Sequence, residues 1–562
     1  MSRLRTSPKY YLDDIDLKDI KALEMRLQTL VQCELKSSAN LEVWLDQERM
    51  LMDGIQEAMT GHKIDFYRDT GNTHKRDMHL YDHSVIQPIL LKYQRELDKK
   101  FCSCPFTGEL HDSRYGAMKR GRLARLQQFC EANIPLTVRE KQLGAKYSEI
   151  RGAMTVDWEG KTKPYSFVQA LLEHPDPTIR ERAWRALAEA RSKVKPEIDD
   201  IMNELVQLRH EMALNAGYGN YRDYMFQVKD REYSIQDCYD FHKSVERHIV
   251  PAWNRLADVF RSELGVNTYR PWDSTAKMLH SIPYTTVTEL MDGVHAMLVK
   301  TDTSFAKRFA FMRERGLLDL ESRQGKQIGG FMDPLPASKH AFVFSNFSPS
   351  FTAIIALIHE MGHAIHVYLN GDFQEQNWRD EVTELYSHGM ELLLLDRLDT
   401  FYPNEREYKS AQREGLRRSL GLLIGPLTRD IFEHWMYTHP NHTAQERDGK
   451  FLEFCKRFRL SPVDTSGLES EVATSWVDTI HFFLYPFYAI EYSISELGAL
   501  QLLEIYRADP RRAISFYKQG ASTNFNYSIS DIYLRTGIKF DFSERVVSRT
   551  GEFLQSQIEQ LK

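Results

Sequence analysis

The sequence predicts a mainly α protein, a large helical bundle with a small β-sheet next to one of its helices. Long segments place apolar residues at the 3.6-residue period of a helix, and few segments alternate apolar and polar residues as strands do. No repeat of fixed period and no low-complexity tract is seen in the sequence, which argues against a solenoid. A composition shift around residues 135 to 165 separates an N-terminal helical region, residues 1–150, from a larger region, residues 151–562.

Composition and charge restrict the classes of function. With 562 residues, of which 42% are hydrophobic, the chain can bury a substantial core. Its 73 Lys and Arg residues against 79 Asp and Glu residues leave a net charge of −6, and there is no long basic run. We therefore expect no nucleic-acid partner. Charge alone identifies no other partner, and it leaves the oligomeric state open.

The N-terminus and the cysteines indicate the compartment. Acidic residues interrupt the N-terminus where a secretory peptide needs a continuous apolar core, and no later stretch approaches the roughly 18 apolar residues of a membrane span. The six cysteines are sparse for this length and fit a reducing compartment. Cys102 and Cys104 lack a second Cys or His pair at finger-like spacing, so we interpret them as ordinary thiols. We expect a soluble, cytoplasmic protein without a membrane partner.

Individual elements can be placed along the chain. Residues 179–214 indicate two amphipathic helices with a break near Pro196. A Gly/Pro-rich loop then leads into the β-favouring run 341–347, the best strand candidate in the chain. An apolar helix follows from about residue 351 to the stop signal at Asn370 and Gly371. After a polar loop, we expect a second helix over residues 379–398.

The apolar helix carries the motif H-E-x-x-H at residues 359–363. Its spacing places His359 and His363 one turn apart on one face of a helix, the geometry in which two imidazoles share one zinc ion. Glu360 projects beside such an ion, where a carboxylate can take a proton from zinc-bound water. The segment before the motif is almost wholly apolar, so three polar groups on a buried helix favour a shared partner.

A hydrolytic zinc site needs a third protein ligand and an open position for water. The second helix offers Glu384, His388 and Glu391 on one face, at i, i+4 and i+7. Spacing alone does not choose among Glu381, Glu384 and His388 as the third ligand.

These motifs resemble the thimet oligopeptidase and oligoendopeptidase F family of zinc metallopeptidases. HEMGHAIH matches the family's H-E-x-G-H-x-x-H, and ELYSHGME matches its E-x-x-S-x-x-x-E on the following helix. The resemblance spans about residues 140 to 550 and implies one zinc ion per chain, with Glu384 as the third ligand. It leaves His388 and Glu391 as residues that orient a ligand.

The resemblance also implies substrate-binding residues. The segment from His481 to Tyr492 looks like the family's Tyr-rich segment, in which two tyrosines seven residues apart face the substrate carbonyl. Tyr485 and Tyr492 have that spacing, with Pro486 in the first turn of a helix. His481 is one position away from the substrate-facing histidine of the thimet branch. The remaining substrate-binding candidates are Tyr488 and four residues of an edge strand that pairs with peptide backbone, Ala341, Phe342, Val343 and Phe344.

The resemblance predicts a zinc-dependent oligoendopeptidase that cuts short unstructured peptides in a deep helical channel. Glu360 acts as general base, and Tyr485 and Tyr492 stabilise the oxyanion. One alternative is a carboxypeptidase or peptidyl-dipeptidase of a related all-helical zinc fold, since HEMGH also resembles the angiotensin-converting-enzyme family. Another is a non-catalytic peptide-binding protein, which predicts losses among the catalytic residues, whereas all of them are present.

Overall fold

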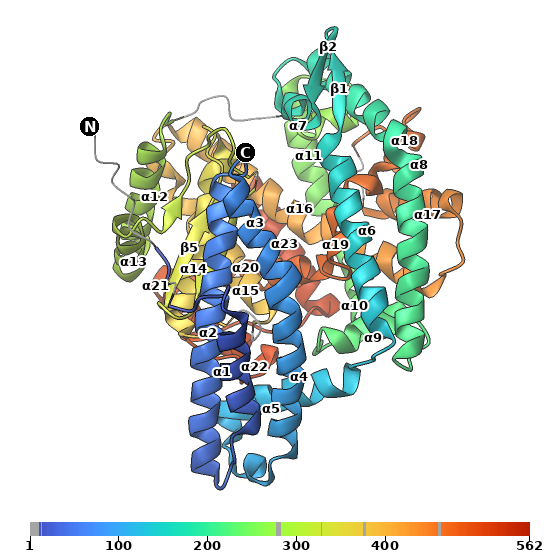
Figure 1. Ribbon diagram of the computed structural model, residues 1–562. Coiled ribbons are helices and arrows are strands. Elements are labelled where there is room, and N and C mark those ends of the chain that lie inside the picture. Colours follow the sequence, from blue (N-terminus) through green and yellow to red (C-terminus); the bar gives the residue numbers. More distant parts are fainter. Residues whose placement is uncertain are drawn as a thin grey trace, which may run out of the picture. The chain divides into compact units, whose positions relative to one another are not determined.

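A computed structural model describes residues 10–12, 14–276, 283–327, 329–374, 378–458 and 462–561 (Figure 1). The structure is mostly helical with two small sheets, which confirms the predicted fold class. The first nine residues, part of the segment used for the compartment prediction, lie outside the described residues. Two compact units make up the chain. Unit 1 comprises Met1–Gln128, Ile282–Pro403 and Gly498–Phe540, and unit 2 comprises Phe129–Ser281, Asn404–Leu497 and Asp541–Lys562.

This grouping differs from the expected division at residue 150. The chain first passes from one unit to the other between Gln128 and Phe129, and the N-terminal helices share unit 1 with the H-E-x-x-H helix. One helix, α20 (Ala489–Ala508), contains the boundary between Leu497 and Gly498.

Unit 1 contains the N-terminal helices and the two helices of the zinc motif. The second of these, expected over 379–398, ends earlier and continues as a short 3-10 turn, Leu395–Thr400. The helices of unit 1 are α1 (Ile20–Gln32), α2 (Ser38–Arg68), α3 (Thr73–Tyr81), α4 (Gln87–Ser103), α5 (Asp112–Gln128), α12 (Val287–Thr301), α13 (Thr303–Glu314), α14 (Phe351–Asn370), α15 (Asp380–Leu393), α21 (Pro510–Ala521) and α22 (Ile529–Arg535).

Helix α14 begins and ends where the sequence predicts. The Ser350 side chain accepts a hydrogen bond from the backbone N–H of Ala353 at the N-terminus. Gly371 adopts the left-handed conformation, with φ of 76°, at the C-terminus. By length and composition alone α14 could cross a membrane, but core helices of soluble proteins pass the same test, and 56% of its apolar window is buried.

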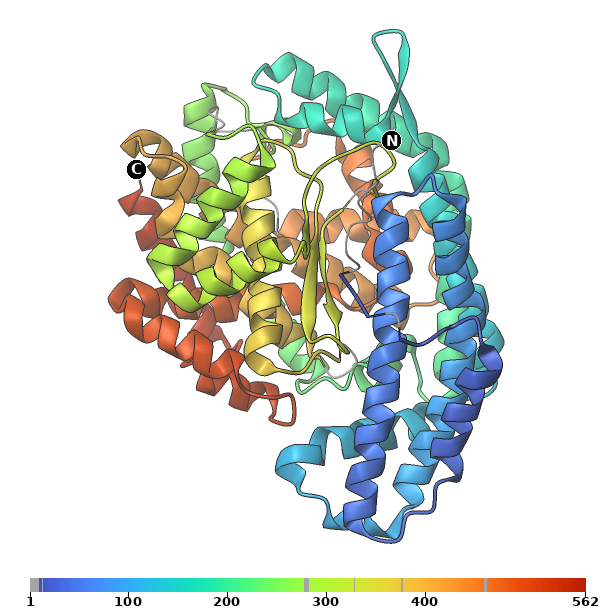
Figure 2. The same ribbon diagram turned by 60° about the vertical axis from the view of Figure 1, so that its left-hand side comes forward.

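A three-stranded sheet lies against α14 and against α2 (Figure 2). Its strands are β3 (Leu318–Asp319), β4 (Phe331–Leu335) and β5 (His340–Phe344), in the order β3-β5-β4. The predicted strand 341–347 is β5, but it is not an edge strand. It pairs in parallel with β3 on one side and antiparallel with β4 on the other.

The expectation that this strand lies at an edge is therefore wrong. Val343 and Phe344 are paired on both sides, Ala341 and Phe342 are paired with β4, and all four side chains are buried. Their role in binding peptide stays a prediction. The edge belongs to β4, whose Pro334 has no N–H to donate, as is typical of edge strands.

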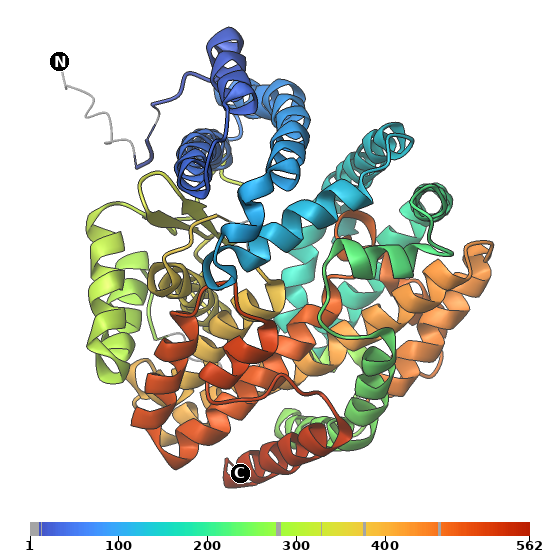
Figure 3. The same ribbon diagram turned by 90° about the horizontal axis from the view of Figure 1, so that it is seen from below.

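Unit 2 contains long helices and a small hairpin. Helix α8 (Pro177–Asn215) runs through Pro196 without the predicted break, because its apolar face continues to pack on both sides of the proline, from Ala183 to Met212. Helix α23 (Glu544–Gln560) packs against α10 (Ile235–His248) and α11 (Val250–Leu264) (Figure 3). The elements are α6 (Asn133–Ala153), β1 (Thr155–Trp158), β2 (Lys161–Pro164), α7 (Tyr165–Ala170), α8 (Pro177–Asn215), α9 (Tyr221–Val228), α10 (Ile235–His248), α11 (Val250–Leu264), α16 (Glu405–Thr438), α17 (Ala444–Phe458), α18 (Glu469–Ala473), α19 (Ile480–Leu484) and α23 (Glu544–Gln560).

Candidate active site

The two histidines of the motif lie one turn apart on α14 and face each other. Their Nε2 atoms are 3.2 Å apart, and both rings are partly buried. On α15, the Oε2 atom of Glu384 lies 3.6 Å from each Nε2 atom. In a tetrahedral zinc site with bonds of about 2.0–2.1 Å, neighbouring donor atoms are about 3.3 Å apart. The three donors therefore fit one zinc ion, and we call His359, His363 and Glu384 the open cluster.

The other acidic and histidine side chains of α15 take different places. Glu391 receives a hydrogen bond of 2.7 Å from Nδ1 of His359, so the metal-binding nitrogen of that ring is Nε2, which faces His363. His388 lies 3.7 Å from Glu384 through its Nε2 atom. His388 and Glu391 also form a possible donor set with His359, but that set omits His363. Glu381 is in neither set.

A close approach of two helices brings these donors together. A Cβ atom on Gly362 would lie 2.6 Å from Cα of Ser387 and 2.8 Å from the backbone oxygen of Tyr386. Only glycine at this position allows α14 and α15 to approach so closely. The Ser387 hydroxyl also donates a 2.9 Å hydrogen bond to Oε2 of Glu384, which holds that carboxylate toward α14.

Burial and facing charges set the protonation of the cluster. Burial alone would lower the pKa of His359, but the hydrogen bond to Glu391 and the charge of Glu384 raise it to about 9. Burial lowers the pKa of His363 to about 4, so this ring keeps a free lone pair at neutral pH. Burial favours protonated Glu384, yet the facing histidines hold its pKa below the usual range. An anionic carboxylate facing a neutral imidazole suits a cation.

Glu360 lies beside the sheet edge. A Cβ atom on Gly330, just before β4, would be 3.8 Å from Oε1 of Glu360. Burial raises the pKa of Glu360 to about 7, and the charge of Asp333 on β4 acts in the same direction. A group with a pKa near neutrality is suited to accept and return a proton.

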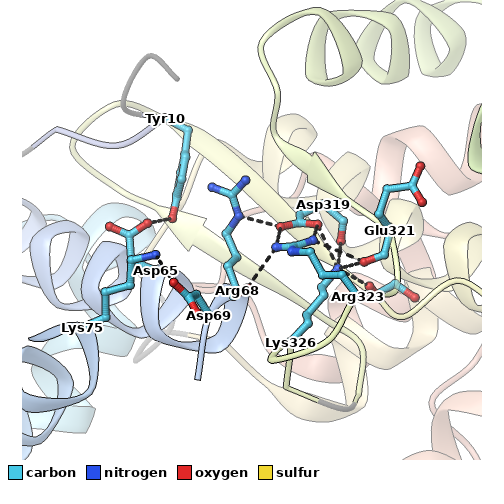
Figure 4. A network of polar contacts seen from close by, with 10 residues as sticks. Tyr10, Asp65, Arg68, Asp69, Lys75, Asp319, Glu321, Arg323 and Lys326 are labelled. Atoms are coloured by element: carbon cyan, nitrogen blue, oxygen red, sulfur yellow. Dashed lines mark hydrogen bonds and ion pairs between the residues drawn. The ribbon is translucent and has the colours of Figure 1, made fainter. Parts of the chain in front are cut away.

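An ion-pair network holds the sheet against α2 (Figure 4). Asp319 of β3 accepts hydrogen bonds from Arg68 at 2.6 Å, from both Nη atoms of Arg323 at 2.7 and 2.8 Å, and from Lys326 at 2.9 Å. The Lys326 ammonium also donates to the backbone oxygens of Glu321 and Ser345. The network thus joins the end of α2 to the loop that leads to β4.

The predicted aromatic residues gather in unit 2. The His481 ring lies 6.0 to 6.3 Å from the rings of Tyr485, Tyr488 and Tyr492. Pro486 lies in a turn before α20, not in its first helical turn, so Tyr485 precedes the helix and is 56% exposed. Tyr492 is in the first turn of α20. Their predicted role as oxyanion donors stays a prediction.

Three features of the site were missed from the sequence. They are the close contact at Gly362, the bond from Ser387 to Glu384, and the place of β4 at the edge. The glycine of H-E-x-G-H, the serine of E-x-x-S and the proline in a strand were available as signals.

Comparisons with known proteins identify the family and the fold. The model of peptidase family M3 matches residues 170–531. An oligoendopeptidase F homolog of Mycoplasma genitalium is 21% identical over 278 residues, which cover 46% of this chain and 45% of the relative. A homolog from Mycoplasma pneumoniae is 20% identical over 399 residues, covering 66% and 63%. The chain thus spans about half to two thirds of these relatives. The solved structure of PZ peptidase A with an inhibitor has the same fold, with a TM-score of 0.86, 21% identity and 98% of each chain covered.

Proposed function

Since this chain belongs to peptidase family M3, we propose that it is a zinc-dependent oligoendopeptidase that hydrolyses internal bonds of short, unstructured peptides. The observation that carries the proposal is the open cluster: three donors at zinc-site spacing with Glu360 beside them. When bound, zinc would supply a Lewis acid that polarises water and the scissile carbonyl.

The protein residues divide the remaining tasks. His359, His363 and Glu384 hold the ion, and Glu391 orients the His359 ring through its Nδ1 atom. Glu360 takes a proton from the attacking water and returns it to the leaving amine. No covalent intermediate with the protein is needed.

The outer edge of β4, with which no described strand pairs, is the proposed support for the peptide backbone. It replaces β5 in this role because β5 is the middle strand of the sheet, whereas β4 lies at the edge and begins beside Glu360. A peptide added to a strand edge is held by backbone hydrogen bonds, so its sequence matters little. Only an extended peptide can add in this way, which supports unstructured substrates over folded proteins. We place the activity in the cytoplasm.

The proposal is tested with an internally quenched peptide whose C-terminus is amidated. The wild type should cut it internally, and a chelator should abolish the cleavage until zinc is restored. Glu384→Ala should lose the ion and the activity, whereas Glu314→Ala, an exposed glutamate on α13, should lose neither. Cleavage only of peptides with a free C-terminus would favour the carboxypeptidase or peptidyl-dipeptidase alternative. Peptide binding without cleavage by the zinc-loaded protein would favour the non-catalytic alternative.

A further inference from the structure

A second group of four donor side chains lies entirely within unit 2. Cys238 and His242 are one turn apart on α10, and Asp430 and His434 are one turn apart on α16. In each helix the i, i+4 spacing places both side chains on one face. All four are fully buried, with at most 1% of any residue exposed. We call these residues the sealed cluster.

Three of the four donors converge, and the fourth, His242, contacts Asp430. One donor atom each from Cys238, Asp430 and His434 lies within 4.8 Å of the others. Oδ2 of Asp430 is 2.8 Å from Nε2 of His242 and 3.3 Å from Nε2 of His434. The separations from Asp430 are near those of neighbouring ligands around one tetrahedral ion. His242 is outside the set of three, so binding by all four residues requires its ring to shift toward Cys238 and His434.

The protein leaves several of these buried atoms unsatisfied. Within the part of the chain that the structure describes, Oδ1 of Asp430 and the Nδ1 atoms of His242 and His434 have no hydrogen-bond partner. Nε2 of His434 has only an ion-pair contact of 3.3 Å with Oδ2 of Asp430. Each such atom costs free energy in a protein interior. A buried His–Asp pair would explain His242 and Asp430 but not the second histidine and the thiol.

Charged side chains also lie around the cluster. Arg231 is a nearby cation, and its charge is partly balanced by Glu491 at 3.3 Å.

We propose that Cys238, His242, Asp430 and His434 bind one zinc ion with a structural role, separate from the ion of the open cluster. The mixed sulfur, nitrogen and oxygen donors suit zinc. Four protein donors without exposure leave no position for water, which is the arrangement of structural sites. The rings of Tyr239 and Phe487 lie 5.1 and 5.6 Å from the ring of His434 and help to shield the cluster from solvent.

The first test is the zinc content of the purified full-length wild type. Two zinc ions per chain are expected, and His363→Ala should retain one of them. After replacement by cobalt, the wild type should show a near-ultraviolet charge-transfer band from thiolate to Co²⁺. The open cluster has no thiolate, so this band reports the sealed cluster alone, and His363→Ala should keep it.

Variants of the cysteine make the test specific. Cys238→Ser should lose the band and one metal ion, whereas Cys102→Ser, an exposed cysteine, should retain both. If Cys238→Ser fails to fold, the wild-type spectrum still tests the proposal. One ion per wild-type chain and no charge-transfer band would overturn it.

Discussion

Two pairs of helices in this protein present donor side chains with the same spacing but in different surroundings. In unit 1, His359 and His363 on α14 face Glu384 on α15, and both histidine rings remain partly accessible. In unit 2, Cys238 and His242 on α10 face Asp430 and His434 on α16, and all four are buried. The i, i+4 pair therefore builds a donor cluster in either setting. Access, an adjacent glutamate and the edge strand β4 are what distinguish the proposed hydrolytic centre from the proposed structural one.

Replacing the glutamate beside each cluster should give the largest difference in kcat between the two sites. Glu360 follows a histidine of the open cluster, and Glu433 precedes a histidine of the sealed cluster. Glu360→Gln should lower kcat about 10²- to 10⁴-fold, because the amide cannot accept the proton. Glu433→Gln should leave kcat nearly unchanged. Glu433 is buried and accepts a 3.0 Å hydrogen bond from the backbone N–H of Phe487, which an amide oxygen can also accept.

Quenched-peptide kinetics and metal analysis of both variants provide the measurement. Glu360→Gln should keep its metal content. An equal loss of kcat in a folded Glu433→Gln protein would break the comparison, because the sealed cluster would then take part in hydrolysis.

The close contact of α14 and α15 predicts opposite effects on stability for alanine substitutions at two helical glycines. Gly362→Ala should lower the free energy of unfolding by about 1–3 kcal/mol, because the new Cβ meets backbone atoms of α15 that cannot move aside. It should also weaken zinc binding by separating Glu384 from the histidines. Gly449→Ala on α17 is the matched control, since its Cβ would have no atom of the described residues within 4 Å. Replacing that helical glycine should stabilise the protein by up to about 1 kcal/mol.

Urea unfolding and zinc titration separate these outcomes. If Gly362→Ala bound zinc as tightly as the wild type, the helix contact would not be what positions the open cluster.

Much of the open cluster could be predicted from the sequence, because its donors lie within single helices. The spacing of His359 and His363 follows from helix geometry alone, and the family motif selects Glu384. The sheet order could not be predicted, because strand pairing joins segments distant along the chain, and β5 was wrongly expected at an edge. The sealed cluster was missed for the same reason. Residues 238 and 430 lie far apart in the sequence, and neither pair forms a known motif.

Glu391 sharpens the comparison further, because it acts only on the open cluster. Glu391→Gln should weaken zinc binding there about 10- to 100-fold, since the charged partner of the His359 ring is lost. The cobalt–thiolate band of the sealed cluster should not change. Competition with a chelator, followed in the cobalt-substituted protein, measures both sites in one sample. Equal weakening at both sites would indicate a general loss of structure instead of a local effect.

The ion-pair network of Asp319 stabilises unit 1, which holds the open cluster, and its contribution to stability depends on pH. Burial would raise the pKa of Asp319, but hydrogen bonds from Arg323 and Lys326 hold it below its usual value. A carboxyl group with a lowered pKa in the folded state stabilises the protein fully above its ordinary pKa of about 3.9. That stabilisation is lost as the pH falls through the folded value.

Arg323→Gln should therefore destabilise unit 1 by about 1 kcal/mol at pH 7, since it removes two hydrogen bonds to this carboxylate. The difference in stability between variant and wild type should shrink below about pH 4. As the pH falls, Asp319 is protonated in the variant before it is protonated in the wild type. Arg313→Gln, which removes an exposed pair with Asp292, should change stability little at either pH. Hydrogen exchange resolved by segment measures the two units separately. If Arg323→Gln weakened protection of α10 and α16 as much as that of β3 to β5, the ion-pair network would not be specific to the surroundings of the open cluster.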